Sequence, residues 1–175
     1  YKPVTKSWRN KSKNEGVSIY QLKIILLGTE PQVWRRIEVP SNMSLNNLSW
    51  GINDAMGWES YHLYLFKFDE FEFGPTEDDL DEWEDDKKAK VRDAFSENKS
   101  IKYFYDFGDG WQHDIIFEGE KAVDPKEQYP LCVDGKNNCP PEDVGGIGGF
   151  ADYKEAMKDK SNPMYEEFFE WRGSY

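Results

Sequence analysis

The sequence predicts an α+β fold: an antiparallel, roll-like sheet of hairpins, with one helix after the first hairpin and helices at the C-terminus. Two observations support this prediction. Segments that alternate apolar and polar residues dominate the first two-thirds of the chain, and segments with helical spacing dominate the end. No regular alternation of strand, helix and strand occurs, which favours hairpins over a parallel sheet. We place a flexible basic arm at 1–16 and a single α+β domain at 17–175.

The first hairpin and the helix after it have the clearest local signals. In 17–27 every second residue from position 20 to position 26 is apolar, which indicates a strand with one buried face. Turn-forming residues separate it from a second strand at 33–39. Ser44 can then accept a hydrogen bond from a free amide of a first helical turn. Gly57 supplies the left-handed residue that commonly ends a helix.

The remaining elements are predicted to be shorter. We expect strands at 62–68, 71–73, 101–106 and 111–118, and helices at 150–158 and 164–171. A short surface helix is expected to run from Thr76 towards Phe95. The proline- and glycine-rich stretch 121–149 is expected to be an ordered but irregular loop.

Charge limits the classes of partner. The formal net charge of −12 repels polyanions, so we expect no general nucleic-acid binding and no binding to anionic membranes. The charge is unevenly placed, because the segment 69–86 holds eleven acidic residues and no basic one. Either this segment is a solvated loop and the arm 1–16 is disordered, or the arm contacts phosphate or the acidic segment.

Cysteine content and hydropathy predict a cytoplasmic protein. Two cysteines in 175 residues do not make a disulfide scaffold, and no apolar leader precedes the first strand. No segment approaches the roughly 20 apolar residues that span a membrane.

The hairpin at 105–113 holds the densest group of reactive side chains. If Asp109 and Gly110 form a two-residue turn, Asp106 lies directly opposite His113 on one face. A carboxylate beside an imidazole raises the pKa of the imidazole and orients it, as in a general base or a metal ligand. Asp106, His113 and Asp109 are therefore catalytic candidates. The alternatives are a turn shifted by one residue, which loses the pair, and a purely structural half-buried histidine.

Two cysteines offer a second set of ligands. Cys132 and Cys139 have six residues between them, which does not match the short spacing of structural zinc sites. With His113 and Asp106 they could still assemble four ligands for a divalent metal. The alternative is a pair of small buried residues in a proline-braced loop.

Arg35 and Arg36 are adjacent on a predicted strand, so their side chains point to opposite faces. At most one of them can join an inward network. Either they pair with local carboxylates at a sheet edge, or they bind an anion near the basic arm.

Six short segments combine these unusual residues in a fixed order. They are Pro-Gln-Val-Trp-Arg-Arg-Ile at 31–37, Ala-Met-Gly-Trp at 55–58, His-Leu at 62–63, Tyr-Asp-Phe-Gly-Asp-Gly-Trp-Gln-His at 105–113, Tyr-Pro-Leu-Cys at 129–132 and Pro-Pro-Glu-Asp-Val-Gly-Gly at 140–146. From about residue 17 to residue 171 the chain thereby resembles the plasmid pRiA4b ORF-3-like family, whose members are also described as passengers of an insertion element.

The resemblance implies an α+β, roll-like fold and no established activity. The chain departs from the family's usual pattern at three positions. Ser49 and Tyr64 stand where histidine is common, and Val144 replaces a frequent cysteine. Of the side chains that relatives would use as metal ligands, this chain keeps His62, His113, Cys132 and Cys139. The departures weaken a metal hypothesis for this chain.

We expect a non-enzymatic binding or accessory protein with a protein or small-molecule partner. Most of its unusual residues are glycine, proline and aromatic residues, which shape the backbone and the packing rather than transfer protons. The candidate binding residues are Arg35, Arg36, Trp58, His62, Trp111, Glu142 and Asp143.

Two other hypotheses remain open. The first is a metal-dependent hydrolase or nucleic-acid-processing enzyme that uses the Asp106 and His113 hairpin. The second is that the acidic segment 69–86 imitates nucleic acid towards a basic partner.

Overall fold

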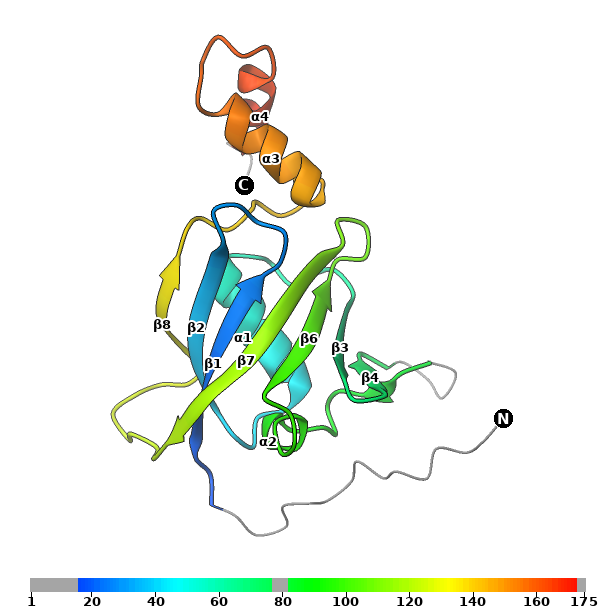
Figure 1. Cartoon of the computed structure of the whole chain (residues 1–175), viewed down its shortest axis with the longest axis vertical. Helices are drawn as coiled ribbons and strands as arrows, with labels where there is room; N and C mark the ends of the chain where they lie inside the picture. Colours follow the sequence, from blue (N-terminus) through cyan, green and yellow to red (C-terminus); the bar gives the residue numbers. More distant parts are fainter. Residues whose placement is uncertain (1–15, 77–81, 173–175) are drawn as a thin grey trace.

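A computed structural model describes residues 16–76 and 82–172 and confirms the α+β class (Figure 1). One mixed sheet has the strand order β5-β4-β3-β6-β7-β1-β2-β8. Of its neighbouring pairs in the described chain, β4 and β5 are parallel and the others are antiparallel. The predicted arm at 1–16, apart from Gly16, and residues 77–81 of the acidic segment lie outside the described residues.

The elements follow one another in a simple order. The strands are β1 (Ile19–Leu26), β2 (Val33–Pro40), β3 (Tyr64–Phe68), β4 (Phe71–Gly74), β5 (Glu84–Asp85), β6 (Ser100–Tyr105), β7 (Trp111–Lys121) and β8 (Leu131–Lys136). The helices are α1 (Leu45–Met56), α2 (Val91–Ala94), α3 (Gly146–Ala156) and α4 (Tyr165–Arg172). In this part of the chain no helix combines the length and the apolar character that crossing a membrane requires.

The first hairpin and α1 form where they were predicted. The alternation in β1 buries Leu22, Ile24 and Leu26 against the core. Ser44 Oγ accepts a hydrogen bond from the backbone of the first turn of α1, and Gly57 ends the helix with a φ of 82°. In Figure 1, α1 lies behind the sheet, where its apolar side packs on the buried strand face.

The hairpin of β6 and β7 differs from the prediction. Tyr105 pairs with Trp111, and Tyr103 pairs with His113. The connection is therefore a five-residue loop at 106–110. The predicted pairing of Asp106 with His113 is wrong, and so is the alternative with the turn shifted by one residue.

Asp106 leaves the strand because it organises this loop. Its backbone has a φ of 53°, and its N–H donates to the Leu63 carbonyl at 2.9 Å. Its own carbonyl accepts from Gly110 N–H at 2.6 Å, and its Oδ1 accepts from Gly108 N–H at 2.9 Å. These bonds outweigh the local preference of Asp-Gly for a two-residue turn.

Three further expectations need correction. The stretch 121–149 contains β8, which pairs with β2 at the edge of the sheet. The expected surface helix towards Phe95 is reduced to the short α2. The helix α3 starts at Gly146, before the predicted start at 150, because its glycines carry no apolar pattern that would signal a helix. In Figure 1, α3 and α4 lie beyond one end of the sheet.

Gly146 makes a close contact that joins α3 to the loop 106–110. Its φ is +68°, and a Cβ added there would fall on the carbonyl oxygen of Asp109. We predict that Gly146→Ala lowers the free energy of unfolding by roughly 2–4 kcal/mol, measured by urea denaturation.

Gly148 is the matched control, since a Cβ at this position of the same helix meets nothing within 4 Å. Gly148→Ala should leave the stability unchanged or raise it by up to about 1 kcal/mol. Equal effects of the two substitutions would contradict this account of the contact.

Candidate functional site

Three loops meet at the end of the sheet where β6 and β7 join. They are residues 57–63 after α1, the loop 106–110, and residues 140–145 before α3. Trp58, 4% exposed, holds them together. Its ring stacks on Tyr105 and Trp111 with centroids 5.1 and 5.7 Å away, and its Nε1–H donates to the Pro140 carbonyl at 2.9 Å.

Glu142 provides a second connection between the loops. Its carboxylate is buried, but both oxygens have partners, as a buried charge requires. Oε2 accepts from the backbone N–H of Glu59 at 2.6 Å, and Oε1 accepts from the Tyr105 hydroxyl. Burial and this carboxylate raise the pKa of Tyr105 above its ordinary value. Tyr105 therefore stays protonated and acts as a donor.

The loops place His62, Asp106 and Asp143 side by side. His62 Nε2 lies 2.9 Å from Asp143 Oδ1 and 3.5 Å from Asp106 Oδ2. One donor atom from each residue lies within 4.8 Å of the other two. The side chains of His62, Asp106 and Asp143 are 25%, 9% and 39% exposed. The cluster is therefore anchored in the protein at Asp106 and open to solvent at Asp143.

Neighbouring groups orient both carboxylates. Asp106 uses Oδ1 for Gly108 N–H, which leaves Oδ2 facing the imidazole. Asp143 accepts a further hydrogen bond from the Tyr61 hydroxyl. Both aspartates have a positive φ, 53° and 58°. Aspartate adopts this left-handed conformation more readily than most residues, because its short side chain can bond to the nearby backbone.

The cluster can act chemically in two ways. With its Nε2 protonated, His62 can donate a hydrogen bond to one of the carboxylates. With a neutral, unprotonated Nε2, the three residues offer one nitrogen and two oxygen donors to a metal ion. Three protein ligands with an open side are typical of metal sites that also bind water or a substrate.

His113, in contrast, does not belong to this cluster. It is fully buried between Trp58 and Tyr103, with ring centroids 5.6 and 5.3 Å away. Its Nδ1 lies 3.3 Å from the Tyr103 carbonyl oxygen. The predicted partner of Asp106 was the wrong histidine, because His62 reaches that carboxylate from a loop distant in sequence.

The predicted metal-ligand set of Asp106, His113, Cys132 and Cys139 is not assembled. Within the described ranges, the group with ligand spacing is His62, Asp106 and Asp143. Cys132 is exposed on β8, and Cys139 is half-buried with its Sγ 3.4 Å from the sulfur of Met56. Burial raises the pKa of Cys139 to about 11, so its thiol stays protonated.

The arginines point to opposite faces of β2, as predicted. Arg35 lies on the α1 side and donates to the carbonyl oxygens of Ala55 and Asn137 at 3.1 and 3.0 Å. Arg36 pairs on the other face with Glu118 at 2.6 Å and Asp134 at 2.7 Å. Both side chains thus bind groups of their own chain.

The other candidates support the cluster rather than join it. Trp58 and Trp111 are buried core residues. Asp109 Oδ2 accepts from the Gly145 N–H at 3.1 Å and so connects the loop 106–110 to the start of α3. Tyr61, which donates to Asp143, was not predicted as a site residue, and only its position next to His62 could have signalled it.

Comparisons with other proteins agree with this fold. A solved structure of a protein of unknown function, MM3350 from Methanosarcina mazei Go1, superposes with a TM-score of 0.82 at 36% identity, covering 90% of each chain. An uncharacterised protein of Sinorhizobium fredii, y4hQ, is 38% identical over 160 residues, which are 90% of this chain and 82% of that protein.

The same comparisons define the family. The family described as plasmid pRiA4b ORF-3-like protein matches residues 18–175. The chain therefore belongs to the plasmid pRiA4b ORF-3-like family. The relatives' descriptions assign no activity, so any function has to be argued from the site.

The burial of His113 predicts a pH dependence of stability. Burial lowers its pKa from 6.5 to about 4. Between these values the unfolded chain binds a proton that the folded protein does not, so stability falls as the pH falls from about 6.5 to about 4. The titration of His113 lowers the free energy of unfolding by up to roughly 3 kcal/mol over this pH range.

Urea denaturation at about pH 7, 5.5 and 4.5 tests this contribution. In His113→Gln, which cannot titrate, the free energy of unfolding should fall less steeply with pH than in the unsubstituted protein. Parallel pH profiles for the two proteins would show that His113 does not titrate as its burial implies.

Proposed function

We propose that this protein is a binding protein whose His62, Asp106 and Asp143 hold a divalent metal ion, through which it recognises a partner or ligand. The observation that carries the proposal is the convergence of three donor atoms within 4.8 Å of one another. They come from three loops far apart in sequence. Hydrogen bonds from Gly108 N–H and from the Tyr61 hydroxyl hold the two carboxylates in place around the imidazole.

The kind of metal follows from the donor set. Imidazole nitrogen suits zinc and other transition metals, whereas carboxylate oxygen suits harder ions such as manganese. One nitrogen and two oxygens therefore favour Zn²⁺ or Mn²⁺. The two buried links, from Trp58 to Pro140 and from Glu142 to Glu59, hold the loops in place without any ion.

Exposed apolar side chains near the cluster support a binding role. Tyr61, Leu63 and Phe107 are 52%, 56% and 51% exposed. All three are chain neighbours of His62 or Asp106. Aromatic side chains such as Tyr61 and Phe107 are enriched where proteins contact other molecules.

Metal binding is measured by titrating Zn²⁺ and Mn²⁺ into the protein in a calorimeter, with protein purified without a metal-affinity tag. We expect one site per chain and an increase in thermal stability, since the ion binds the folded state. His62→Ala and Asp143→Asn should each weaken the binding by about tenfold or more.

Asp134→Asn is the matched control, because this exposed carboxylate on β8 pairs with Arg36 and is not part of the cluster. Its metal affinity should equal that of the unsubstituted chain. Absence of metal binding by the folded protein, or equal affinities in all three variants, would rule the proposal out.

A metal-dependent hydrolase is the second candidate. The observation that favours it is the exposure of the cluster at Asp143, which leaves room for a water molecule on the ion. A bound divalent metal lowers the pKa of such a water and makes it a nucleophile near neutral pH.

The hydrolase is tested with bis(nitrophenyl) phosphate and a nitrophenyl ester in the presence of the metal that binds. Hydrolysis should fall by about 100-fold or more in His62→Ala, while Asp134→Asn keeps the full rate. If the protein binds the metal tightly but hydrolyses neither substrate, the hydrolase hypothesis is rejected and the binding hypothesis is retained.

A further inference from the structure

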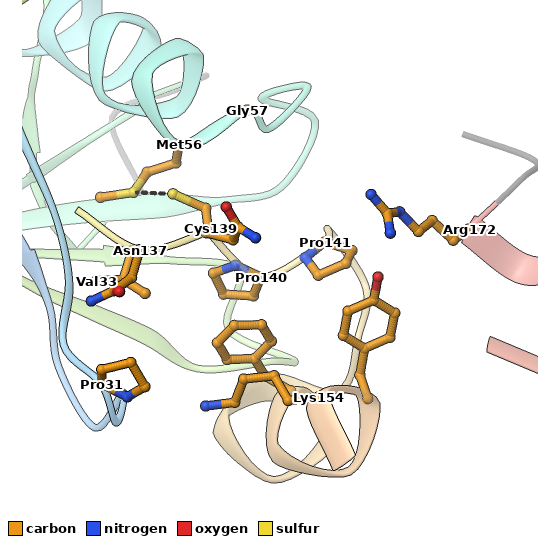
Figure 2. A pocket seen from close by; sticks show the side chains of 13 residues that line it. Pro31, Val33, Met56, Gly57, Asn137, Cys139, Pro140, Pro141, Lys154 and Arg172 are labelled. Atoms are coloured by element: carbon orange, nitrogen blue, oxygen red, sulfur yellow. Dashed lines mark hydrogen bonds between the residues drawn. The ribbon is translucent and has the colours of Figure 1, made fainter. Parts of the chain in front are cut away.

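The residues that precede Glu142 and Asp143 in the chain line a cavity. This cavity of about 520 Å³ opens between the end of α1, the start of β2, residues 137–141 and the two C-terminal helices (Figure 2). This volume is within the range of small-molecule sites, roughly 300–1,000 Å³. None of the three cluster residues lines it.

The walls of the cavity are mainly apolar. The apolar lining consists of Pro31, Val33, Met56, Pro140, Pro141 and Phe150. Met56, Pro140 and Phe150 are buried in the fold, so this part of the wall is held by the core. Asn137, Asn138 and Tyr153 add groups that can form hydrogen bonds. Such a lining suits a ligand with an apolar body and few polar groups.

The charge of the cavity is opposite to that of the protein. The formal net charge of the chain is −12. Among the described residues that line the cavity, Lys154 and Arg172 are charged, and none is a carboxylate. Figure 2 shows Arg172 extending towards the cavity from α4, while the Lys154 amine on α3 points away from Arg172. An anion is therefore attracted here although the protein as a whole repels it.

Lys154 is positioned by its own neighbours. Its Nζ donates to the Glu30 carbonyl at 2.6 Å and lies 4.7 Å from the centroid of the Phe150 ring. An ammonium group has three donors, so Lys154 keeps donors for a ligand. Because these contacts already restrict its side chain, less conformational freedom is lost when an anion binds.

From these observations we propose that this cavity binds a small organic anion, whose carboxylate or phosphate group is attracted by the charges of Lys154 and Arg172 and whose apolar body lies against Met56 and Phe150. The attachment is non-covalent. Cys139 also lines the cavity, but its thiol stays protonated and is therefore a poor nucleophile. This inference is independent of metal binding at His62.

The test uses anilinonaphthalene sulfonate, a fluorescent apolar anion, and its neutral analogue phenylnaphthylamine. We expect one sulfonate dye to bind per folded chain. Lys154→Gln and Arg172→Gln should each weaken that binding by about fivefold, as expected for the loss of one partly exposed charge pair. Neither substitution should change the affinity for the neutral dye.

Two further variants distinguish binding of the dye in the cavity from nonspecific binding of the dye elsewhere on the protein. Lys158→Gln removes a positive charge just beyond α3 that pairs with Glu155 and does not line the cavity; it should bind the sulfonate dye normally. Asn138→Trp adds bulk at an exposed lining residue and should weaken the binding of both dyes. The proposal is wrong if the folded protein binds neither dye, or if all four variants bind the sulfonate dye equally.

Competition identifies the anionic group. Benzoate or phenyl phosphate should displace the sulfonate dye, and the better competitor tells whether the site prefers a carboxylate or a phosphate. Neutral benzamide should not displace it. Equal displacement by all three compounds, or by none of them, would overturn the proposal of an anion site.

Discussion

The arrangement of the loops that carry His62, Asp106 and Asp143 depends on the burial of one indole ring. Trp58 stacks between aromatic residues of β6 and β7 and donates its single N–H to Pro140. A buried indole needs both an apolar surface and an acceptor. The rings of Tyr105 and Trp111 supply the surface, and the Pro140 carbonyl supplies the acceptor. The loops that carry His62, Asp106 and Asp143 are brought together as a consequence, although each is short and irregular by itself.

The segment 137–143 adjoins both the cavity and the cluster of His62, Asp106 and Asp143. Its first part, up to Pro141, forms a wall of the cavity beside α3, while Glu142 and Asp143 belong to the other end of the same short stretch. The buried carboxylate of Glu142 accepts hydrogen bonds from a backbone amide and a tyrosine hydroxyl. These bonds hold the segment in place between the cavity and the cluster. The proposed metal site and the proposed anion cavity therefore adjoin the same segment but have different lining residues.

Local sequence signals were sufficient to predict an element where neighbouring residues alone determine its structure. The alternation in β1, the Ser44 cap and the Gly57 terminus are properties of neighbouring residues, and each formed as predicted. Signals failed where distant groups compete. Asp-Gly at 109–110 favours a two-residue turn, but the hydrogen bond of Asp106 to Leu63 lengthens the loop. Strand β8 lacks an apolar pattern and exists because β2 offers it an edge.

The sequence by itself determined the fold class, the family and most of the residues at the site, since composition, periodicity and motif order depend on the chain alone. It singled out Asp106, Asp143 and His62, but it could not group them. Only the tertiary structure decided that His62 rather than His113 faces the carboxylate, and that the cysteines lie apart. The physical reason is that the two histidines are chemically alike, and burial, which depends on the packing of the whole chain, makes one of them a core residue and leaves the other accessible.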